Sequence, residues 1–201
     1  MALAPPLVWL TDARLVSDAV LAAFADCFSP SERLRFAAFT RPLRQRQFLI
    51  GRILLRQALA SLLDARAQDL RLVERPGAAP LLERKGAEGL GFSISHSGPW
   101  VACAASSSSA LGLDIEVLDP ARDLEAMAEH AFDAEELAWW RGRHSASRRR
   151  DFYELWCAKE ARFKMPAAQG SCLPLFHPEL AIALCSEQPL AQLPVLSLRS
   201  L

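Results

Sequence analysis

The most constraining feature of this sequence is residues 111–117, which read LGLDIEV and place two carboxylates in an otherwise apolar run. Alternate residues of a β-strand point to opposite faces of its sheet. Asp114 and Glu116 therefore share one face, and Leu113, Ile115 and Val117 share the other. Two like charges side by side on a strand repel each other, and a cation is the usual means of offsetting that repulsion. The segment predicts a strand that carries a cation site.

Composition limits the class of protein. The chain has 201 residues, of which 51% are hydrophobic and 23% are charged, and its formal net charge is zero. A chain of this size can bury a sizeable core in one large or two small domains. The zero net charge argues against binding to nucleic acid. Because no run of about 18 apolar residues and no basic leader is present, we expect a cytoplasmic protein that does not associate with membranes.

The cysteines do not form a recognisable framework. They are odd in number and scattered along the chain, at Cys27, Cys103, Cys157, Cys172 and Cys185, with no CxxC pair. Structural zinc sites use closely spaced cysteine or histidine ligands, and disulfide-rich folds use an even number of cysteines. We therefore expect neither a zinc site nor a disulfide framework.

The pattern of apolar residues and turn signals predicts an α+β fold with two similar halves. In the first half it indicates strands at 7–10, 69–74, 91–95 and 100–105, helices at 17–27 and 42–63, a helix beginning at Ser29, and a loop over 75–90. In the second half it indicates strands at 111–117, 179–185 and 194–199, and helices at 133–143 and 147–165. The repeated order predicts two α/β subdomains related by a pseudo-twofold axis, residues 1–107 and 108–201. We expect a ligand to bind at the interface between the two subdomains.

A second segment, residues 156–164, reads WCAKEARFK and is predicted to be helical. Glu160 and Lys164 are four residues apart and so share one helix face. One interpretation is an ordinary surface ion pair. The other is that Glu160 joins Asp114 and Glu116 in a magnesium site, because Mg²⁺ prefers carboxylate oxygens and is usually shared with substrate phosphates.

A third segment, residues 92–98, reads FSISHSG and places His96 among serine hydroxyls before a turn. His96 can be a structural histidine, or it can form a phosphate cradle together with Ser95. Residues 31–56 hold seven arginines and one acid, which indicates either a solvated helix face or an anion site. Walker, Rossmann and GxSxG signatures are missing from the sequence.

Together these three segments, in this order and at these separations, resemble the 4′-phosphopantetheinyl transferases, and in particular their longer, pseudo-dimeric bacterial kind. The arginine-rich segment extends the likeness upstream to about residue 29. The resemblance implies a transferase of the holo-acyl-carrier-protein synthase type. Such an enzyme moves the 4′-phosphopantetheine group of coenzyme A to a serine of an acyl or peptidyl carrier protein and releases 3′,5′-ADP.

The resemblance also implies roles for individual residues. Asp114, Glu116 and Glu160 would hold Mg²⁺ or Mn²⁺, Glu160 would help to deprotonate the carrier serine, and Lys164 would neutralise the pyrophosphate. The residues implied in substrate binding are Arg46, Arg52, Ser95, His96, Lys159 and Lys164. The carrier protein and coenzyme A are the implied partners. Because one chain contains both halves, we expect the protein to be a monomer.

The sequence departs from the family pattern near residue 79. Many members carry Gly-Lys-Pro at the nucleotide site, where this chain has Ala78-Ala79-Pro80. Arg75 or Arg84 could replace the missing lysine. Two other functions stay open: a non-catalytic homologue that binds coenzyme A or a carrier protein, and a metal-dependent phosphohydrolase. The physiological carrier and its pathway, which could be fatty-acid, polyketide or non-ribosomal peptide synthesis, also stay open.

Overall fold

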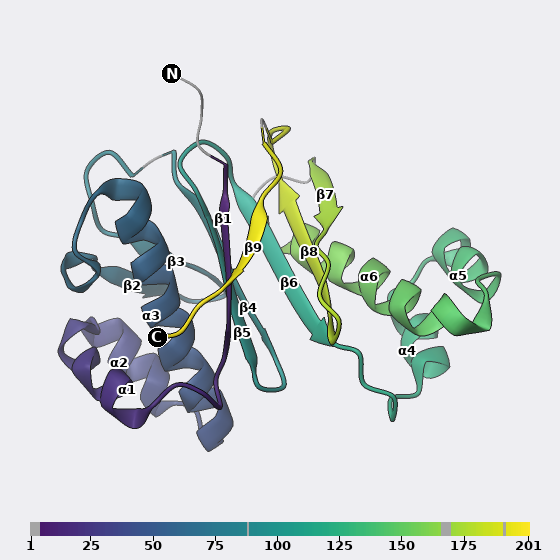
Figure 1. Cartoon of the computed structure of the whole chain (residues 1–201), viewed down its shortest axis with the longest axis horizontal. Coiled ribbons are helices and arrows are strands. Elements are labelled where there is room, and N and C mark those ends of the chain that lie inside the picture. The colour runs from purple at the N-terminus through teal and green to yellow at the C-terminus, as the bar shows by residue number, and fades with distance from the viewer. Residues whose placement is uncertain (1–4, 88, 166–169, 191) are drawn as a thin grey trace.

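The computed structural model of the chain describes residues 5–87, 89–165, 170–190 and 192–201. It confirms the predicted α+β fold with two subdomains, which lie side by side (Figure 1). The first contains β1 (Leu7–Asp12), α1 (Asp18–Ala23), α2 (Pro30–Ala37), α3 (Pro42–Leu63), β2 (Leu72–Arg75), β3 (Ala78–Leu82), β4 (Gly91–Ser97) and β5 (Trp100–Ser106). The second contains β6 (Leu111–Val117), α4 (Leu124–Ala131), α5 (Ala134–Arg141), α6 (Ser145–Phe163), β7 (Ser171–Pro174) and β8 (Leu180–Ser186). The last strand, β9 (Val195–Leu198), joins the sheet of the first.

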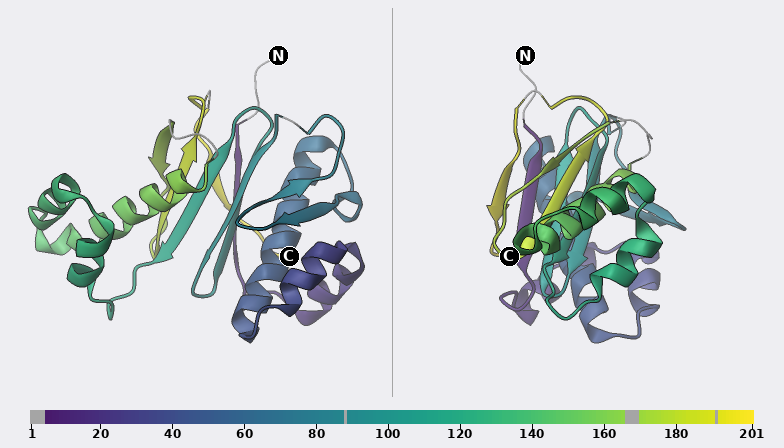
Figure 2. Two further views of the ribbon diagram at one scale, coloured as in Figure 1. Left: turned by 180° about the vertical axis from the view of Figure 1, so that it is seen from behind. Right: turned by 90° about the vertical axis from the view of Figure 1, so that its right-hand side faces the viewer.

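Two sheets form the centre of the molecule. One has the strand order β4-β5-β1-β9 and the other β6-β8-β7, while β2 and β3 form a separate ribbon. Helix α3 covers the outer face of the first sheet and α6 that of the second (Figures 1 and 2). The apolar side chains between the sheets include Val8, Leu10, Leu113 and Ile115. The layers therefore follow the order helix, sheet, sheet, helix. Within the described ranges, no helix has the length and apolar character needed to cross a bilayer.

Local signals explain where several helices begin. The side chain of Ser29 accepts a hydrogen bond from the N–H of Glu32, and the Glu32 carboxylate accepts one from the N–H of Ser29. Asp133 and Glu136 form the same reciprocal capping box at the start of α5. Such boxes satisfy backbone donors that a helix leaves unpaired at its first turn. Both helix starts were predicted from the sequence, as was the whole of α3.

The last strand crosses back to the other half of the molecule. β9 pairs in parallel with β1, with Leu7 opposite Val195. Beyond β9, the N–H of Arg199 donates to the carbonyl of Leu10 at 2.8 Å, and the hydroxyl of Thr11 donates to the carbonyl of Arg199 at 2.7 Å. The subdomain division at residue 107 stays a prediction, but the sheet of the first half includes a strand from the end of the chain.

The prediction of a loop over residues 75–90 was wrong for β3. Its strand pairs with β2 through a tight turn at Gly77, whose φ of 67° favours glycine. Pro80 lies within this strand. Proline is tolerated there because each strand of a two-stranded ribbon is an edge strand, and one side of its backbone needs no partner.

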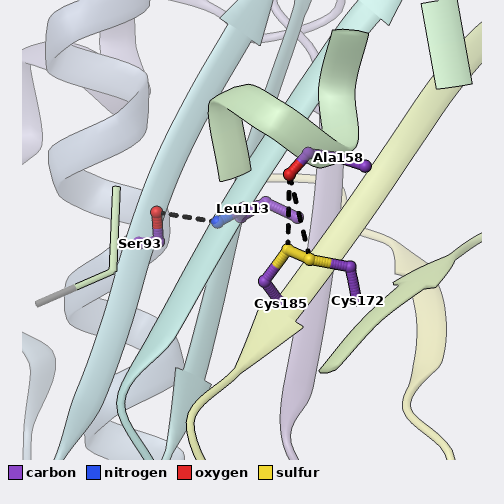
Figure 3. The surroundings of a disulfide bond; sticks show 5 residues. All are labelled: Ser93, Leu113, Ala158, Cys172 and Cys185. Atoms are coloured by element: carbon purple, nitrogen blue, oxygen red, sulfur yellow. Dashed lines mark hydrogen bonds between the residues drawn. A yellow bond between two sulfur atoms is a disulfide. The ribbon is translucent and has the colours of Figure 1, made fainter. Parts of the chain in front are cut away.

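The sequence argued against a disulfide framework and did not predict the disulfide that the structure contains. Cys172 and Cys185 lie opposite each other in the register of β7 and β8, and their sulfurs are bonded (Figure 3). Both sulfurs lie close to the carbonyl oxygen of Ala158 in α6, at 3.8 and 3.6 Å. The pairing was missed because strand register, and not cysteine spacing, brings these two residues together.

Gly112 allows α6 to pack directly on β6. A Cβ atom at residue 112 would lie 1.8 Å from the carbonyl oxygen of Ala161. We expect Gly112→Ala to lower the free energy of unfolding by about 1–3 kcal/mol, because the helix must move away from the strand. Urea unfolding measures the loss. Gly142→Ala is the matched control, because a Cβ there meets its nearest atoms at 3.4 Å and the backbone is right-handed helical. An equal loss of unfolding free energy in the two variants would contradict the role of Gly112 in packing α6 on β6.

Candidate active site

The two sheets are joined along β4 and β6 by serine side chains. Three alternate hydroxyls of β4 each accept a hydrogen bond from a backbone N–H of β6: Ser93 from Leu113 at 3.0 Å, Ser95 from Ile115 at 3.3 Å, and Ser97 from Val117 at 3.0 Å. Figure 3 shows the first of these bonds. This row of bonds, here called the serine seam, brings the two carboxylates of β6 next to β4.

Asp114 and Glu116 share one face of β6, as the sequence predicted. Oδ1 of Asp114 accepts hydrogen bonds from the Ser95 hydroxyl at 2.9 Å and from Nζ of Lys164 at 2.7 Å. Oδ2 of Asp114 is buried and has no hydrogen-bond partner among the described residues. Oε2 of Glu116 accepts from the Ser97 hydroxyl at 2.7 Å. Burial raises the pKa of Glu116, and the bond from Ser97 opposes that rise.

Lys164 joins the end of α6 to this pair of strands. Its ammonium group also donates to the Ser95 hydroxyl at 3.2 Å and to the carbonyl of Leu113 at 3.1 Å. Asp114 is thus neutralised by a lysine of this chain. Both Lys164 and Ser95, which were implied in substrate binding, lie beside the predicted cation site.

Glu160 is not brought beside the two strand carboxylates. It lines a separate cavity of about 540 Å³ between α4 and α6, together with Trp156, Met127 and His130. Across the part of the chain that is described, no three metal-ligating side chains are grouped closely enough to hold a metal ion. Lys159 lines the same cavity and pairs with Glu136 of α5 at 2.5 Å. The roles of Glu160 and Lys159 stay predictions.

A cavity of about 550 Å³ lies between the subdomains. Its cationic lining residues come from α2, α3, the β2–β3 ribbon and the end of α6, and they are Arg35, Arg44, Arg52, Arg75 and Lys164. His96 also lines it, and none of the described aspartates or glutamates does. Arg35 and Arg52 pair with Glu74, and Lys164 pairs with Asp114, so Arg44 and Arg75 are the lining cations without a carboxylate partner among the described ion pairs, and the lining suits an anion. We call it the arginine pocket.

Buried acids behind the arginine pocket hold its arginines in place. Glu74 of β2 pairs with Arg52 at 2.6 Å and with Arg35 at 2.7 Å. One layer deeper, Glu32 pairs with Arg56 at 2.6 Å, and both side chains are fully buried. These ion pairs fix two arginines from different helices at one wall of the pocket.

Sequence reasoning identified Arg52, His96 and Lys164 of the arginine pocket and named Arg75 as one replacement for the missing lysine, but it did not single out Arg35 or Arg44. Arg46, the other arginine implied in substrate binding, pairs with Asp18 at 2.6 Å and donates to the carbonyl of Ala13 at 3.1 Å, away from the pocket. Arg75 does line the pocket, and its Nε–H donates to the carbonyl of Ala79 at 2.9 Å. Arg75 is thus next to the position where the family lysine is missing, whereas Arg84 lines a neighbouring cavity.

The position of His96 predicts a pH effect on stability. Burial, together with the charges of Arg44 and Lys164, lowers its pKa from 6.5 to about 4. The unfolded chain binds this proton below about pH 6.5, and the folded chain does so only below about pH 4. The free energy of unfolding should therefore fall by about 2–3 kcal/mol as the pH drops from 6.5 to 4. Urea unfolding of wild type and of His96→Gln measures it, and equal pH slopes in the two proteins would disprove the assignment.

Comparison with known proteins shows the family of the chain. The family model for the 4′-phosphopantetheinyl transferase superfamily matches residues 110–185, and a model for the N-terminal part of a 4′-phosphopantetheinyl transferase matches residues 16–108. The chain is 30% identical over 173 residues to the 4′-phosphopantetheinyl transferase HetI of Nostoc sp., which covers 86% of this chain and 71% of that protein. The chain belongs to the 4′-phosphopantetheinyl transferase superfamily.

Other members of the superfamily show a similar degree of likeness. A putative 4′-phosphopantetheinyl transferase of Synechocystis sp., slr0495, is 29% identical over 79% of this chain and 63% of its own length. The transferase Sfp of Bacillus subtilis is 29% identical over 76% of this chain and 65% of its own length. The chain thus spans about two thirds of the length of these phosphopantetheinyl transferases.

Proposed function

We propose that this chain transfers the 4′-phosphopantetheine group of coenzyme A to a serine of an acyl or peptidyl carrier protein and releases 3′,5′-ADP, as a transferase of the holo-acyl-carrier-protein synthase type. The observation that carries the proposal is the position of Lys164. This one side chain lines the arginine pocket and also pairs with Asp114. A pocket for a polyanion thus lies next to a carboxylate pair suited to a cation.

Coenzyme A matches the charge of the arginine pocket. It carries a pyrophosphate and a 3′-phosphate on one nucleotide, and arginine binds phosphate oxygens through two parallel N–H groups. Arg44 and His96 lie in contact at one wall and are proposed to hold the 3′-phosphate. Arg75, on the ribbon, is proposed to take over the nucleotide contact of the missing lysine.

The residues at the serine seam fit a divalent cation. A buried carboxylate oxygen without a partner is costly, and Oδ2 of Asp114 is such an atom. We propose that Asp114 and Glu116 hold Mg²⁺ or Mn²⁺, and that Glu160, which lines the cavity between α4 and α6 in this structure, would turn toward them as the third ligand. When bound, the cation would neutralise charge that develops on the 5′-phosphate of the leaving 3′,5′-ADP.

The remaining roles follow from the C-terminal end of α6. Glu160 and Lys164 lie one helical turn apart, and Glu160 lines the cavity between α4 and α6. We propose that the carrier serine approaches from that cavity and gives its proton to Glu160. Lys164 stabilises negative charge on the pyrophosphate. Because transfer of a phosphoryl-type group needs little covalent help from the protein, positioning and charge neutralisation supply most of the catalysis.

The decisive test is mass spectrometry of apo carrier proteins incubated with the purified chain, coenzyme A and Mg²⁺. We expect the carrier to gain the mass of one phosphopantetheine group, and the preferred carrier would identify the pathway. If the chain is instead a binding homologue, it binds coenzyme A or carrier without any mass gain, and Asp114→Ala does not alter carrier binding. A phosphohydrolase would degrade coenzyme A without a carrier. Either result would overturn the proposal. Sedimentation would test the expected monomer.

A further inference from the structure

We propose that Ser95 and Ser97 are positioning residues, which hold one oxygen of each carboxylate on β6 so that the other oxygen is left to a divalent cation. The inference rests on the cation site of the proposed function. The Ser95 and Ser97 hydroxyls join the two sheets, and orienting the carboxylates would be their second role.

The contacts are matched residue by residue along the two strands. The Ser95 hydroxyl donates to Oδ1 of Asp114 at 2.9 Å, and the Ser97 hydroxyl donates to Oε2 of Glu116 at 2.7 Å. Each carboxylate therefore has one oxygen fixed by β4. Oδ2 of Asp114 is buried with no partner in the described part of the chain, which is the arrangement expected for a ligand oxygen.

The backbone of β6 determines the direction in which each hydroxyl donates. A serine oxygen has one proton and two lone pairs. In Ser95, the lone pairs accept from the N–H of Ile115 at 3.3 Å and from Lys164 at 3.2 Å. The proton is then left for Asp114. In Ser97, a lone pair accepts from the N–H of Val117 at 3.0 Å while the proton bonds to Glu116.

Burial makes this arrangement rigid. The exposed fractions of Ser95, Ser97 and Asp114 are 5%, 9% and 5%. Water has little access to replace a lost hydroxyl at these positions. Without its serine, Glu116 would lose the bond from β4, and Asp114 would keep only the bond from Lys164, which comes from α6. A ligand set whose orientation is held by neighbouring hydrogen bonds binds its metal more tightly than one that is free to rotate.

Ser93 provides a matched control from the same seam. Its hydroxyl accepts from the N–H of Leu113 at 3.0 Å, as the other two serines do for their partners. The residue of β6 beside it is Gly112, which has no side chain to hold. Replacing Ser93 therefore removes one bond of the seam without affecting a carboxylate.

The test is titration of the full chain with Mn²⁺ alone, followed by electron paramagnetic resonance of the free ion. We expect Ser95→Ala and Ser97→Ala to weaken Mn²⁺ binding by about tenfold or more, the loss typical of a removed group that orients a metal ligand. Ser93→Ala should bind Mn²⁺ as wild type does. Ser95→Thr and Ser97→Thr retain the hydroxyl and should restore the affinity. The midpoints of urea unfolding identify the folded variants. If Ser95→Ala is unfolded, the Mn²⁺ affinities of Ser97→Ala and Ser97→Thr test the inference.

Two results would overturn the inference: an equal loss of Mn²⁺ affinity in Ser93→Ala, or wild-type affinity in the folded Ser97→Ala. Absence of saturable Mn²⁺ binding to the wild type would also overturn it. The proposed function fails by a different result, the absence of any mass gain on a carrier protein. Transfer by the wild type together with equal Mn²⁺ affinities in all variants would reject the positioning role and leave the function standing.

Discussion

Asp114→Asn is expected to lower the rate of phosphopantetheine transfer by about a thousandfold or more, while the protein stays folded. The amide has nearly the same shape as the carboxylate, and its oxygen can still accept from Ser95 and Lys164. What it lacks is the charge that holds a cation, and charged groups aimed at a reacting phosphate supply much of the catalysis in such reactions. Mass spectrometry of the carrier as a function of time measures the rate.

Asp119→Asn is the control for this prediction. Asp119 follows β6 directly, its side chain is 40% exposed, and it lies 3.8 Å from Arg122. Removing its charge should change transfer less than threefold, a difference of about 0.7 kcal/mol or less in activation free energy. If Asp114→Asn retained the wild-type rate at low Mg²⁺, the carboxylate would not take part in catalysis.

Arg56→Met should lower the free energy of unfolding by about 3–5 kcal/mol, because the buried Glu32 carboxylate loses its two closest charged contacts and keeps only Arg52, at 3.8 Å. The guanidinium contacts both oxygens of Glu32, at 2.9 and 2.6 Å, and neither side chain is exposed. It also donates to the carbonyl of Leu70 at 3.1 Å, so one side chain joins α2, α3 and the segment that leads to β2. Urea unfolding measures the loss.

Two further variants separate the buried charge from the general loss of an arginine. Arg66→Met removes an exposed ion pair with Asp69 and should cost less than about 1 kcal/mol. The double variant Glu32→Gln with Arg56→Met removes both charges and should be more stable than Arg56→Met alone. A loss below about 1 kcal/mol in Arg56→Met would show that water reaches this pair.

Local sequence signals predicted the elements that depend on near neighbours. The helix 42–63 and the capping residues Ser29 and Asp133 follow from contacts within a few residues. The faces of β6 follow from strict alternation. The motifs of residues 92–164 also identified the family, which the comparisons confirm.

Contacts between residues far apart in the sequence could not be predicted from local sequence patterns. Arg44 and Arg46 are two residues apart on one helix and so point in nearly opposite directions. The sequence separates them into two faces, but only the tertiary structure shows that Arg44 lines the arginine pocket. The pairing of Cys172 with Cys185, and that of Lys164 with Asp114, depend in the same way on how the strands and α6 pack.

The return of β9 to β1 has a consequence for dividing the molecule. A chain cut between β5 and β6 would give one fragment without the outer strand of its own sheet and another carrying that strand without a partner. Each fragment would expose an open β-edge, which promotes association with other strands. Mixing the two fragments would allow β9 to pair with β1 again. The fold is thus suited to fragment complementation. Recovery of transferase activity would then report that the two fragments have associated.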